Sequence, residues 1–474
     1  MACRLRRRLS LIVALTFAAG AVACASVALA AEVGVNVTTT TAFESPKALA
    51  AIRASRPAWV RVFVGWNVME PQRQSFEPTQ VNAYRRFFRA LPRGTKVDVD
   101  VVSTPSWASG SSSPAAPPQN DADFAWFVNH LATLLHNRVT SWEIWNEESS
   151  PAWWSGSVAQ YADLVKAAYP AIKAADPKAK VVLGANSPLM LSQLYADGIH
   201  NYFDADAIHT DTACNVTSPY IYEYNRDTTV INQYFFLGFT GIHALMAANG
   251  DASKPIYMTE IGWSSTSAEC STGLWAGKKL AGVSQQTQAT YLTQAYHCLA
   301  QPRYSYIKAA MWFELQNGGP SGQPLDNYGL LNLDYSPKPS FDAFEQISLH
   351  GDTQAASCGN FAAPRITILH PTPGSAYSGP LHIAVSASSP GNGVREITID
   401  LTRHSREHFG SKRGFPPTLS ASLTWLGARN LKAGPHKIKI VVIDKLGNVA
   451  TRTFRIMHVR AAPVVRRHRH HHHR

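Results

Sequence analysis

The chain has 474 residues, of which 45% are hydrophobic and 10% aromatic, so a globally disordered protein is excluded. Its net charge of +12 is uneven: residues 364–474 hold eighteen Lys and Arg against four Asp and Glu, whereas residues 31–363 are mildly acidic. The length accommodates a barrel of about 250–330 residues and one small module. The basic C-terminal part suggests attraction to a polyanion, and a merely solvated positive face is the alternative.

Residues 1–30 have the pattern of an export signal. Four arginines between Arg4 and Arg8 form a basic start, Leu9–Cys24 is apolar, and Ala28-Leu29-Ala30 is a small-residue cleavage site. A membrane anchor is the alternative, but the apolar run is short and no later stretch of about 20 apolar residues follows. The sequence therefore predicts a secreted, extracellular protein that could be associated with a cell wall, with a mature chain beginning near Ala31.

Residues 31–350 alternate short apolar β-like runs with helical patterns, as βα units around a parallel sheet do. Eight such runs predict an α/β fold, a (β/α)8 TIM barrel whose active site lies at the C-terminal ends of the strands. The strands are expected over Val33–Val37, Trp59–Val64, Lys96–Val102, Thr140–Trp145, Lys180–Gly184, Ala205–His209, Pro255–Thr259 and Ile307–Phe313. The helices include Val81–Leu91, Asp121–Leu135, Ser157–Ala175 and Gln285–Ala300.

The composition changes after a linker expected over residues 351–363. Residues 364–459 alternate apolar and polar residues in short runs such as Glu396-Ile-Thr-Ile399, which predicts a small all-β sandwich. Trp425, Gly434-Pro-His436 and Asp444-Lys-Leu-Gly-Asn448 make this part resemble the bacterial immunoglobulin-like modules appended to secreted enzymes. Residues 460–474 form a basic tail rich in Arg and His, expected to be disordered.

Four of the six cysteines lie outside the predicted signal: Cys214, Cys270, Cys298 and Cys358. An even number of cysteines in an exported protein predicts disulfide bonds. On the predicted barrel, Cys214 and Cys270 follow neighbouring strands on one face, and the other two lie near the last helices, so we expect the bridges Cys214–Cys270 and Cys298–Cys358. Because no Cys-x-x-Cys motif occurs, a zinc site is not expected, and neither is any other metal or cofactor.

Two glutamates follow predicted strands about a hundred residues apart. Glu147 closes the run Trp142-Glu-Ile-Trp-Asn-Glu147, and Glu260 lies in Tyr257-Met-Thr-Glu260-Ile-Gly-Trp263. A solvated surface position is the ordinary interpretation of one Glu. Both, however, lie among large apolar residues, where an unpaired charge is costly. Retaining glycoside hydrolysis needs two carboxyls about 5–5.5 Å apart, which this pair could supply.

The order of motifs in residues 31–350 resembles the clan A glycoside hydrolases, and most of all family 39 and its bacterial relatives. The matching residues are Arg61, Glu70-Pro71, Thr104-Pro-Ser-Trp107, Trp145-Asn-Glu147, His209, Glu260, Trp312, Gly329-Leu330 and Pro337-Lys-Pro339. The resemblance implies a retaining glycosidase that cleaves O-glycosidic bonds of a β-linked polysaccharide or oligosaccharide. A transglycosidase and a non-catalytic carbohydrate-binding or cell-wall-binding protein are the alternatives. No nucleic acid partner and no membrane span are expected, and the basic C-terminal module could bind an anionic polymer of the cell envelope.

The resemblance also implies roles for the two glutamates. Glu147 is expected to be the general acid/base, with a pKa raised by desolvation from Trp142, Trp145 and Trp153. Glu260 is expected to be the nucleophile, kept ionised and oriented by Arg61, which is also expected to bind substrate. Asn146 is expected to bond the sugar 2-hydroxyl. Strict strand alternation would place Asn146 and Glu147 on opposite faces, so the strand must end or bulge there.

Other acids and one histidine compete for roles. Glu148 is expected to be exposed on a loop, Glu143 to lie inside the barrel with a partner, and Glu314 either to contact substrate or to cap the last strand. His209 is expected to contact substrate, a satisfied core histidine being the alternative. Family members usually have Pro-Tyr after this histidine, but Thr210-Asp211 follows here, so Tyr220, Tyr222 or Tyr224 could support the nucleophile instead.

Several of the twelve tryptophans fall at predicted strand ends. Aromatic rings stack on the apolar faces of sugars, and rim packing is the alternative. We expect substrate contact from Trp66, Trp107 and Trp312, and favour it less for Trp153 and Trp154. Because specificity depends on loops such as Ser103–Asn120, the sequence does not identify the sugar.

Overall fold

The structure is a computed structural model. It describes residues 31–185, 187–211, 214, 216–223, 231–271, 276–320, 322–351, 358, 362–390, 392–402, 405–411, 414–445 and 447–460. The predicted export signal, residues 352–357 and 359–361 of the predicted linker, and all but the first residue of the predicted tail lie outside these residues. Among the described helices, none combines the length and the apolar character that a membrane crossing requires.

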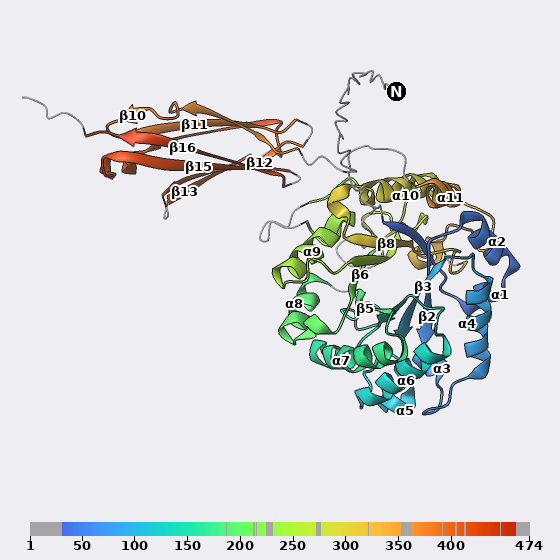
Figure 1. Cartoon of the computed structure of the whole chain (residues 1–474). Helices are drawn as coiled ribbons and strands as arrows, with labels where there is room; N and C mark the ends of the chain where they lie inside the picture. The colour runs from blue at the N-terminus through green and yellow to red at the C-terminus, as the bar shows by residue number, and fades with distance from the viewer. Residues whose placement is uncertain are drawn as a thin grey trace, which may run out of the picture.

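Eight parallel strands close into a barrel in their sequence order, β1 to β8, which confirms the predicted TIM barrel (Figure 1). Their apolar, β-branched composition suits strands covered on both faces. The strands are β1 Glu32–Asn36, β2 Trp59–Gly65, β3 Lys96–Val102, β4 Ser141–Ile144, β5 Lys180–Ala185, β6 Ala205–Asp211, β7 Ile256–Gly262 and β8 Ile307–Trp312.

Helices surround the barrel strands on the outside (Figure 1). Several begin with a side chain that caps the first turn, and Ser157 and Gln160 form a complete capping box at α7. The helices are α1 Thr40–Glu44, α2 Pro46–Ser55, α3 Trp66–Met69, α4 Pro78–Ala90, α5 Ser106–Ser109, α6 Asp121–Leu134, α7 Val158–Ala175, α8 Pro188–Ala196, α9 Phe239–Ala248, α10 Gln285–Leu299 and α11 Pro339–His350. Short 3-10 turns lie at Ile199–Asn201, Phe236–Gly238, Pro302–Tyr304, Pro324–Asn327 and Leu426–Asn430.

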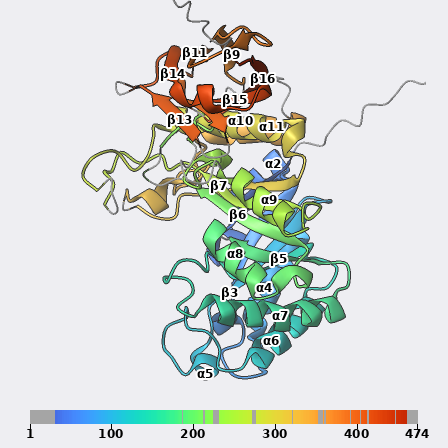
Figure 2. The same cartoon turned by 90° about the vertical axis from the view of Figure 1, so that its left-hand side faces the viewer.

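The C-terminal part forms a β-sandwich, as the period-two pattern predicted (Figure 2). A five-stranded sheet in the order β10-β16-β15-β12-β13 and a three-stranded sheet in the order β14-β11-β9 share one apolar core. The resemblance to immunoglobulin-like modules stays a prediction. The strands are β9 Arg365–His370, β10 Ala376–Tyr377, β11 Leu381–Ser388, β12 Val394–Thr402, β13 Ser405–Gly410, β14 Thr418–Trp425, β15 Gly434–Asp444 and β16 Val449–His458.

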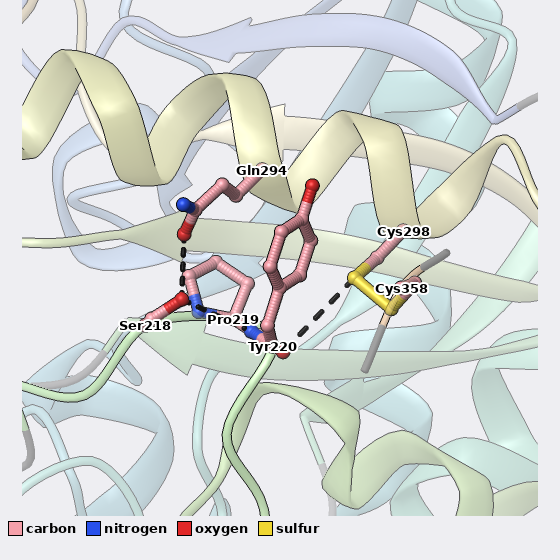
Figure 3. Close-up of a disulfide and its surroundings, with 6 residues drawn as sticks. All are labelled: Ser218, Pro219, Tyr220, Gln294, Cys298 and Cys358. Atoms are coloured by element: carbon pink, nitrogen blue, oxygen red, sulfur yellow. Dashed lines mark hydrogen bonds between the residues drawn. A yellow bond between two sulfur atoms is a disulfide. The ribbon is translucent and has the colours of Figure 1, made fainter. Parts of the chain in front are cut away.

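The structure contains disulfide bonds between Cys214 and Cys270 and between Cys298 and Cys358, the two pairs expected from the barrel arrangement. The second bond joins α10 to the chain beyond α11 (Figure 3). Beside it, the Ser218 hydroxyl donates to Gln294 on α10 at 2.5 Å (Figure 3). The segment after β6 is therefore held against α10 next to this bridge.

Candidate active site

The chain changes direction where β4 ends, and this brings two neighbouring side chains into one site. Strand β4 ends at Ile144, and both Trp145 (φ 71°) and Glu147 (φ 43°) adopt left-handed backbone conformations. Such conformations are strained for residues with a Cβ and cluster at functional sites. Asn146 consequently contacts Arg61 while Glu147 contacts His209, so both point into the barrel mouth. This turn resolves the conflict with strand alternation.

The two glutamates predicted as catalytic lie close together, with His209 between them. His209 on β6 pairs in register with Glu260 on β7. Its Nδ1 lies 2.9 Å from Glu147 Oε1, and its Nε2 lies 3.6 Å from Glu260 Oε1. A carboxylate oxygen of Glu147 and one of Glu260 lie within 4.8 Å of each other. This spacing is close to the separation of about 5–5.5 Å that a retaining pair of carboxyls needs.

Arg61 on β2 is fully buried and uses all five of its N–H groups. One of these bonds, from Nη1 to Glu260 Oε1 at 2.6 Å, orients the predicted nucleophile. The remaining acceptors are Glu143 (2.7 Å), Asn36 (3.0 Å), Asp100 (2.8 Å) and Asn146 (3.0 Å). Because no N–H is left for a ligand, the expectation that Arg61 binds substrate directly is wrong. Its expected role of orienting Glu260 agrees with this hydrogen bond.

The pKa shifts of the two glutamates are the reverse of those expected. Burial favours a raised pKa for Glu147, but the hydrogen bond and positive charge of His209, with Arg61, lower the pKa below its ordinary value. Burial raises the pKa of Glu260, and the charges of His209 and Arg61 do not cancel this. Burial lowers the pKa of His209, but Glu260 and Glu147 outweigh it and raise the pKa to about 10. In the ligand-free protein, His209 therefore carries the proton of the cluster.

Below the site, the barrel interior is rich in acids. Glu143 is buried and accepts from Arg61 and from the Thr259 hydroxyl, as expected for an interior residue with a partner. Burial raises the pKa of Asp98 and of Asp100 well above the ordinary value, and Glu143 adds to both shifts. One guanidinium does not balance this many carboxyls, so burial here favours the neutral forms of Asp98 and Asp100.

The prediction that Trp66 and Trp312 contact the substrate is wrong. Trp66 and Trp312 are fully buried, and their indole N–H groups donate to Glu70 and to the Tyr328 carbonyl. Both side chains belong to the buried hydrophobic core, where their large apolar area stabilises the fold. Trp107 is half-buried, donates to the Glu70 carbonyl and has the Arg73 guanidinium 5.5 Å from its ring centre, so its contact with substrate stays a prediction.

An aromatic surface does lie beside the acid pair; sequence reasoning missed Phe63 and favoured Trp153 too little. Phe63 on β2 and Trp153 after β4 are both half-buried, and their rings stack at 6.0 Å with an interplanar angle of 10°. The Trp153 side chain also hydrogen-bonds Glu147, and Phe63 lies under the Arg61 guanidinium at 4.5 Å. The run Trp59–Gly65 contained a usable signal, because Phe63 follows Arg61 by two residues and so shares its face.

The structure also corrects Glu148, which was expected to be exposed. It is 3% exposed, its carboxyl lies against Gly184, and burial raises its pKa well above the ordinary value. Neither carboxyl oxygen accepts a hydrogen bond from another described residue. The left-handed turn at Glu147 sends this neighbour inward, and a protonated carboxyl is what such a place tolerates.

The tyrosines proposed to support the nucleophile do not do so in the described structure. Tyr220 packs against His297, Tyr222 is buried with its hydroxyl 3.4 Å from Asn448 of the sandwich, and Tyr224 lies outside the described residues. The described partners of the Glu260 carboxylate are Arg61 and His209. Thr210 and Asp211 occupy the positions where family members usually have Pro-Tyr. Strand β6 continues through both residues, in register with β7.

Within the described residues, Glu147, His209 and Glu260 form a cluster whose donor atoms could also hold a metal ion. Two carboxylates and an imidazole are suitable ligands for zinc. The Glu260 oxygen involved, however, already accepts from the Arg61 guanidinium, a fixed positive charge at 2.6 Å that disfavours a second cation. The arrangement suits proton transfer between acids better than metal binding.

Two cavities flank the acid pair. The first, which we call the Glu147 pocket, measures about 290 Å³ and is lined by Glu147, His209, Ser150, Ser187, Thr210 and Tyr234, among others. The second, the Glu314 pocket, measures about 170 Å³ and is lined by Asn36 at the end of β1 and by residues after β1 and β8, including Thr38, Glu314, Asn317 and Tyr335. Asn36 connects this second pocket to Arg61 and hence to Glu260.

Comparison with known proteins shows the fold and no closer relationship. No protein-family model and no curated protein matches the chain. A family 39 glycoside hydrolase from the gut symbiont Bacteroides cellulosilyticus WH2 aligns with a TM-score of 0.54 and 18% identity, over 83% of this chain and 79% of that one. A GH5_18 protein from Streptomyces cattleya, solved in complex with GlcNAc, aligns with a TM-score of 0.49 and 16% identity, over 74% of this chain and 84% of that one. At 18% identity, the first likeness shows a shared barrel fold.

Proposed function

We propose that the protein is a secreted retaining glycoside hydrolase that cleaves O-glycosidic bonds of a β-linked polysaccharide or oligosaccharide. The observation that carries the proposal is the pair Glu147 and Glu260, on strands β4 and β7, with carboxylate oxygens within 4.8 Å of each other. The half-buried rings of Phe63 and Trp153 beside the pair offer a stacking surface for a sugar. The two disulfide bonds suit the oxidising environment that a secreted protein meets.

In the proposed mechanism, His209 first passes its Nδ1 proton to Glu147 along their 2.9 Å contact. Glu147 then protonates the leaving oxygen while Glu260 attacks the anomeric carbon, so that the glycosidic bond breaks and a glycosyl ester forms. In the second step, Glu147 removes a proton from water, the water oxygen attacks the same carbon, and Glu260 is released. Asn146 is placed for the sugar 2-hydroxyl, because Arg61 holds its Oδ1 and leaves the amide N–H groups facing away from the guanidinium.

The proposal is tested by the release of reducing sugars from a panel of polysaccharides. Glu260→Gln keeps an acceptor for Arg61 but removes the nucleophile, and Glu147→Gln removes the acid. We expect each to lower kcat by at least about 10³-fold, by analogy with the loss of one member of a catalytic unit. Glu44→Gln, at an exposed glutamate on α1, is the matched control. Equal activity of Glu260→Gln and wild type rejects the assignment, and products enlarged by an added acceptor sugar indicate transglycosylation.

We further propose that the sandwich holds the enzyme to an anionic polymer of the cell envelope. Lys437 on β15 and Arg455 on β16 are exposed and directly opposite each other, a destabilising like-charge pair that an anion would relieve. Binding of the whole protein to heparin and to isolated cell walls tests this. We expect binding that falls between 0.1 and about 1 M salt, where screening shortens to about 3 Å, and that is weakened by Lys437→Glu with Arg455→Glu. Binding that does not depend on salt rejects the proposal.

A further inference from the structure

The Glu314 pocket is lined by polar groups and lies near the nucleophile, since Glu314 interacts electrostatically with Glu260. It is formed by the chain after β1, which supplies Thr38 and Thr39, and by the chain after β8, which supplies Glu314 and Asn317. Glu314 is 4% exposed, and its described hydrogen bond is the one donated by the Thr38 hydroxyl. The pocket's volume of about 170 Å³ is below the range of about 300–1,000 Å³ for pockets that hold drug-sized ligands, so it suits a small ligand such as a single sugar unit.

The charges around this pocket determine which sugar it can hold. Among the described residues that line the Glu314 pocket and the Glu147 pocket, none is a lysine or an arginine. Apart from the tyrosines Tyr234 and Tyr335, the titratable side chains described there are the acids Glu147 and Glu314, and His209, which lies between two carboxylates. A ligand carboxylate or sulfate would therefore lose its water without gaining a counter-charge.

The two buried basic side chains near the site, Arg61 and Lys338, do not change this conclusion, because the N–H groups of both are already bonded to protein acceptors, and burial lowers the pKa of Lys338 to about 7. Arg61 gives all five N–H groups to protein acceptors. Lys338, which is 1% exposed, lies behind Asn317 and donates to Ser265 Oγ (3.0 Å), Asn317 Oδ1 (2.6 Å) and the Asn327 carbonyl (3.2 Å). An ammonium has three N–H groups, so none remains for a ligand.

We propose that the Glu314 pocket is a subsite for one uncharged sugar unit, and that the enzyme discriminates against uronates and sulfated sugars at this position. The inference rests on the proposed glycosidase function. Glu314, Thr38 and Asn317 present carboxyl, hydroxyl and amide groups, which pair with sugar hydroxyls. Burial raises the pKa of Glu314 to about 7 and the negative charge of Glu260 adds to this rise, so a negative charge on a ligand beside Glu314 also meets repulsion from Glu260.

Polymers that differ only at the sixth carbon test the proposal. The probes are β-1,4-mannan against β-1,4-polymannuronate, and β-1,4-glucan against β-1,4-polyglucuronate, alongside a wider panel of neutral polysaccharides. We expect wild type to cleave a neutral polymer with kcat/KM at least about a hundredfold above that for the matched uronate, since unpaired buried polar groups give discrimination of this order. Cleavage of either polyuronate as fast as its neutral partner overturns the inference and leaves the glycosidase function standing. No release from any polymer by wild type overturns both.

Substitutions in the Glu314 pocket test whether this pocket binds the neutral sugar unit. Glu314→Ala is expected to raise KM for the neutral polymer about tenfold with a smaller change in kcat, because it removes binding rather than chemistry. Thr38→Val, which removes the hydroxyl that bonds Glu314, is expected to act in the same direction and guards against a misfolded Glu314→Ala protein. Glu44→Gln is the control, as an exposed acid on α1 outside the pocket. Unchanged KM in both pocket variants, with native circular dichroism, rejects the pocket as a subsite.

Discussion

Arg61→Met is the substitution whose consequence the structure specifies most fully. Methionine fills much of the same space but leaves Glu260, Glu143 and Asp100 without their shared cation. Hydrogen bonds to charged groups contribute about 1.5–3 kcal/mol each, but five bonds from one group are not additive. Removing one partner from a buried ion pair costs about 3–5 kcal/mol. Because the carboxyls can relax by taking up protons, we expect a loss near that range, about 3–5 kcal/mol of unfolding free energy.

Guanidinium chloride unfolding measures this loss. With a slope of at most about 6 kcal/mol per molar denaturant, the midpoint is expected to fall by at least about 0.5 M. Arg86→Met is the matched control, since Arg86 is 58% exposed and pairs with Glu44 on the surface, where such pairs contribute at most about 1 kcal/mol. A midpoint for Arg61→Met equal to that of Arg86→Met would refute the account of Arg61 as the centre of the buried network.

The same variant has a predicted pH dependence. Without Arg61, which lowers the pKa of Asp98, Asp100 and Glu260, these carboxyls have still higher pKa values in the folded state than in wild type. A raised carboxyl pKa means that the folded state binds more protons than the unfolded state, so stability falls as pH rises. The stability of Arg61→Met relative to wild type should therefore decrease from pH 5 to pH 8. A difference that stays constant over this range would contradict the argument.

Three further predictions follow from the site and the disulfides. His209→Gln should move both limbs of the pH profile of kcat/KM to higher pH, because His209 lowers the pKa of Glu147 and of Glu260; an unmoved profile would show that His209 does not couple to the pair. Trp153→Ala should raise KM on a neutral oligosaccharide, whereas Trp154→Ala, at a buried ring, should lower thermal stability instead; the reverse pattern would count against the stacking surface. Cys298→Ser with Cys358→Ser should cost about 4 kcal/mol in chemical unfolding, as expected for a bridge spanning 60 residues, and a change below about 1 kcal/mol would contradict the entropic account.

Much of the fold could be predicted from sequence because its signals are local. Apolar β-branched runs such as Lys96–Val102 correspond to strands with the same bounds, and Ser157 begins a helix as its capping residue should. The order of the strands was also enough to predict that Arg61 contacts Glu260, because both residues lie on strands whose ends meet at one face of the barrel. Such predictions require only the order of the strands and their alternation.

Other parts of the site depend on contacts that no local pattern contains. The left-handed turn at Trp145 and Glu147 buries Glu148, and neither residue type normally signals such a backbone. The reversed pKa shifts arise because the His209 ring lies between the two glutamates, whereas the sequence placed it only near them. The burial of Trp312 likewise depends on a partner distant in sequence, the Tyr328 carbonyl.

The stereochemistry of hydrolysis tests the central claim most directly. Proton NMR of the first product released from a cleaved polysaccharide distinguishes the two anomers before they interconvert. Because the carboxylate oxygens of Glu147 and Glu260 lie within 4.8 Å of each other, we predict a double displacement and a product that keeps the anomeric configuration of the substrate. A first product of inverted configuration would contradict the assignment of Glu260 as the nucleophile.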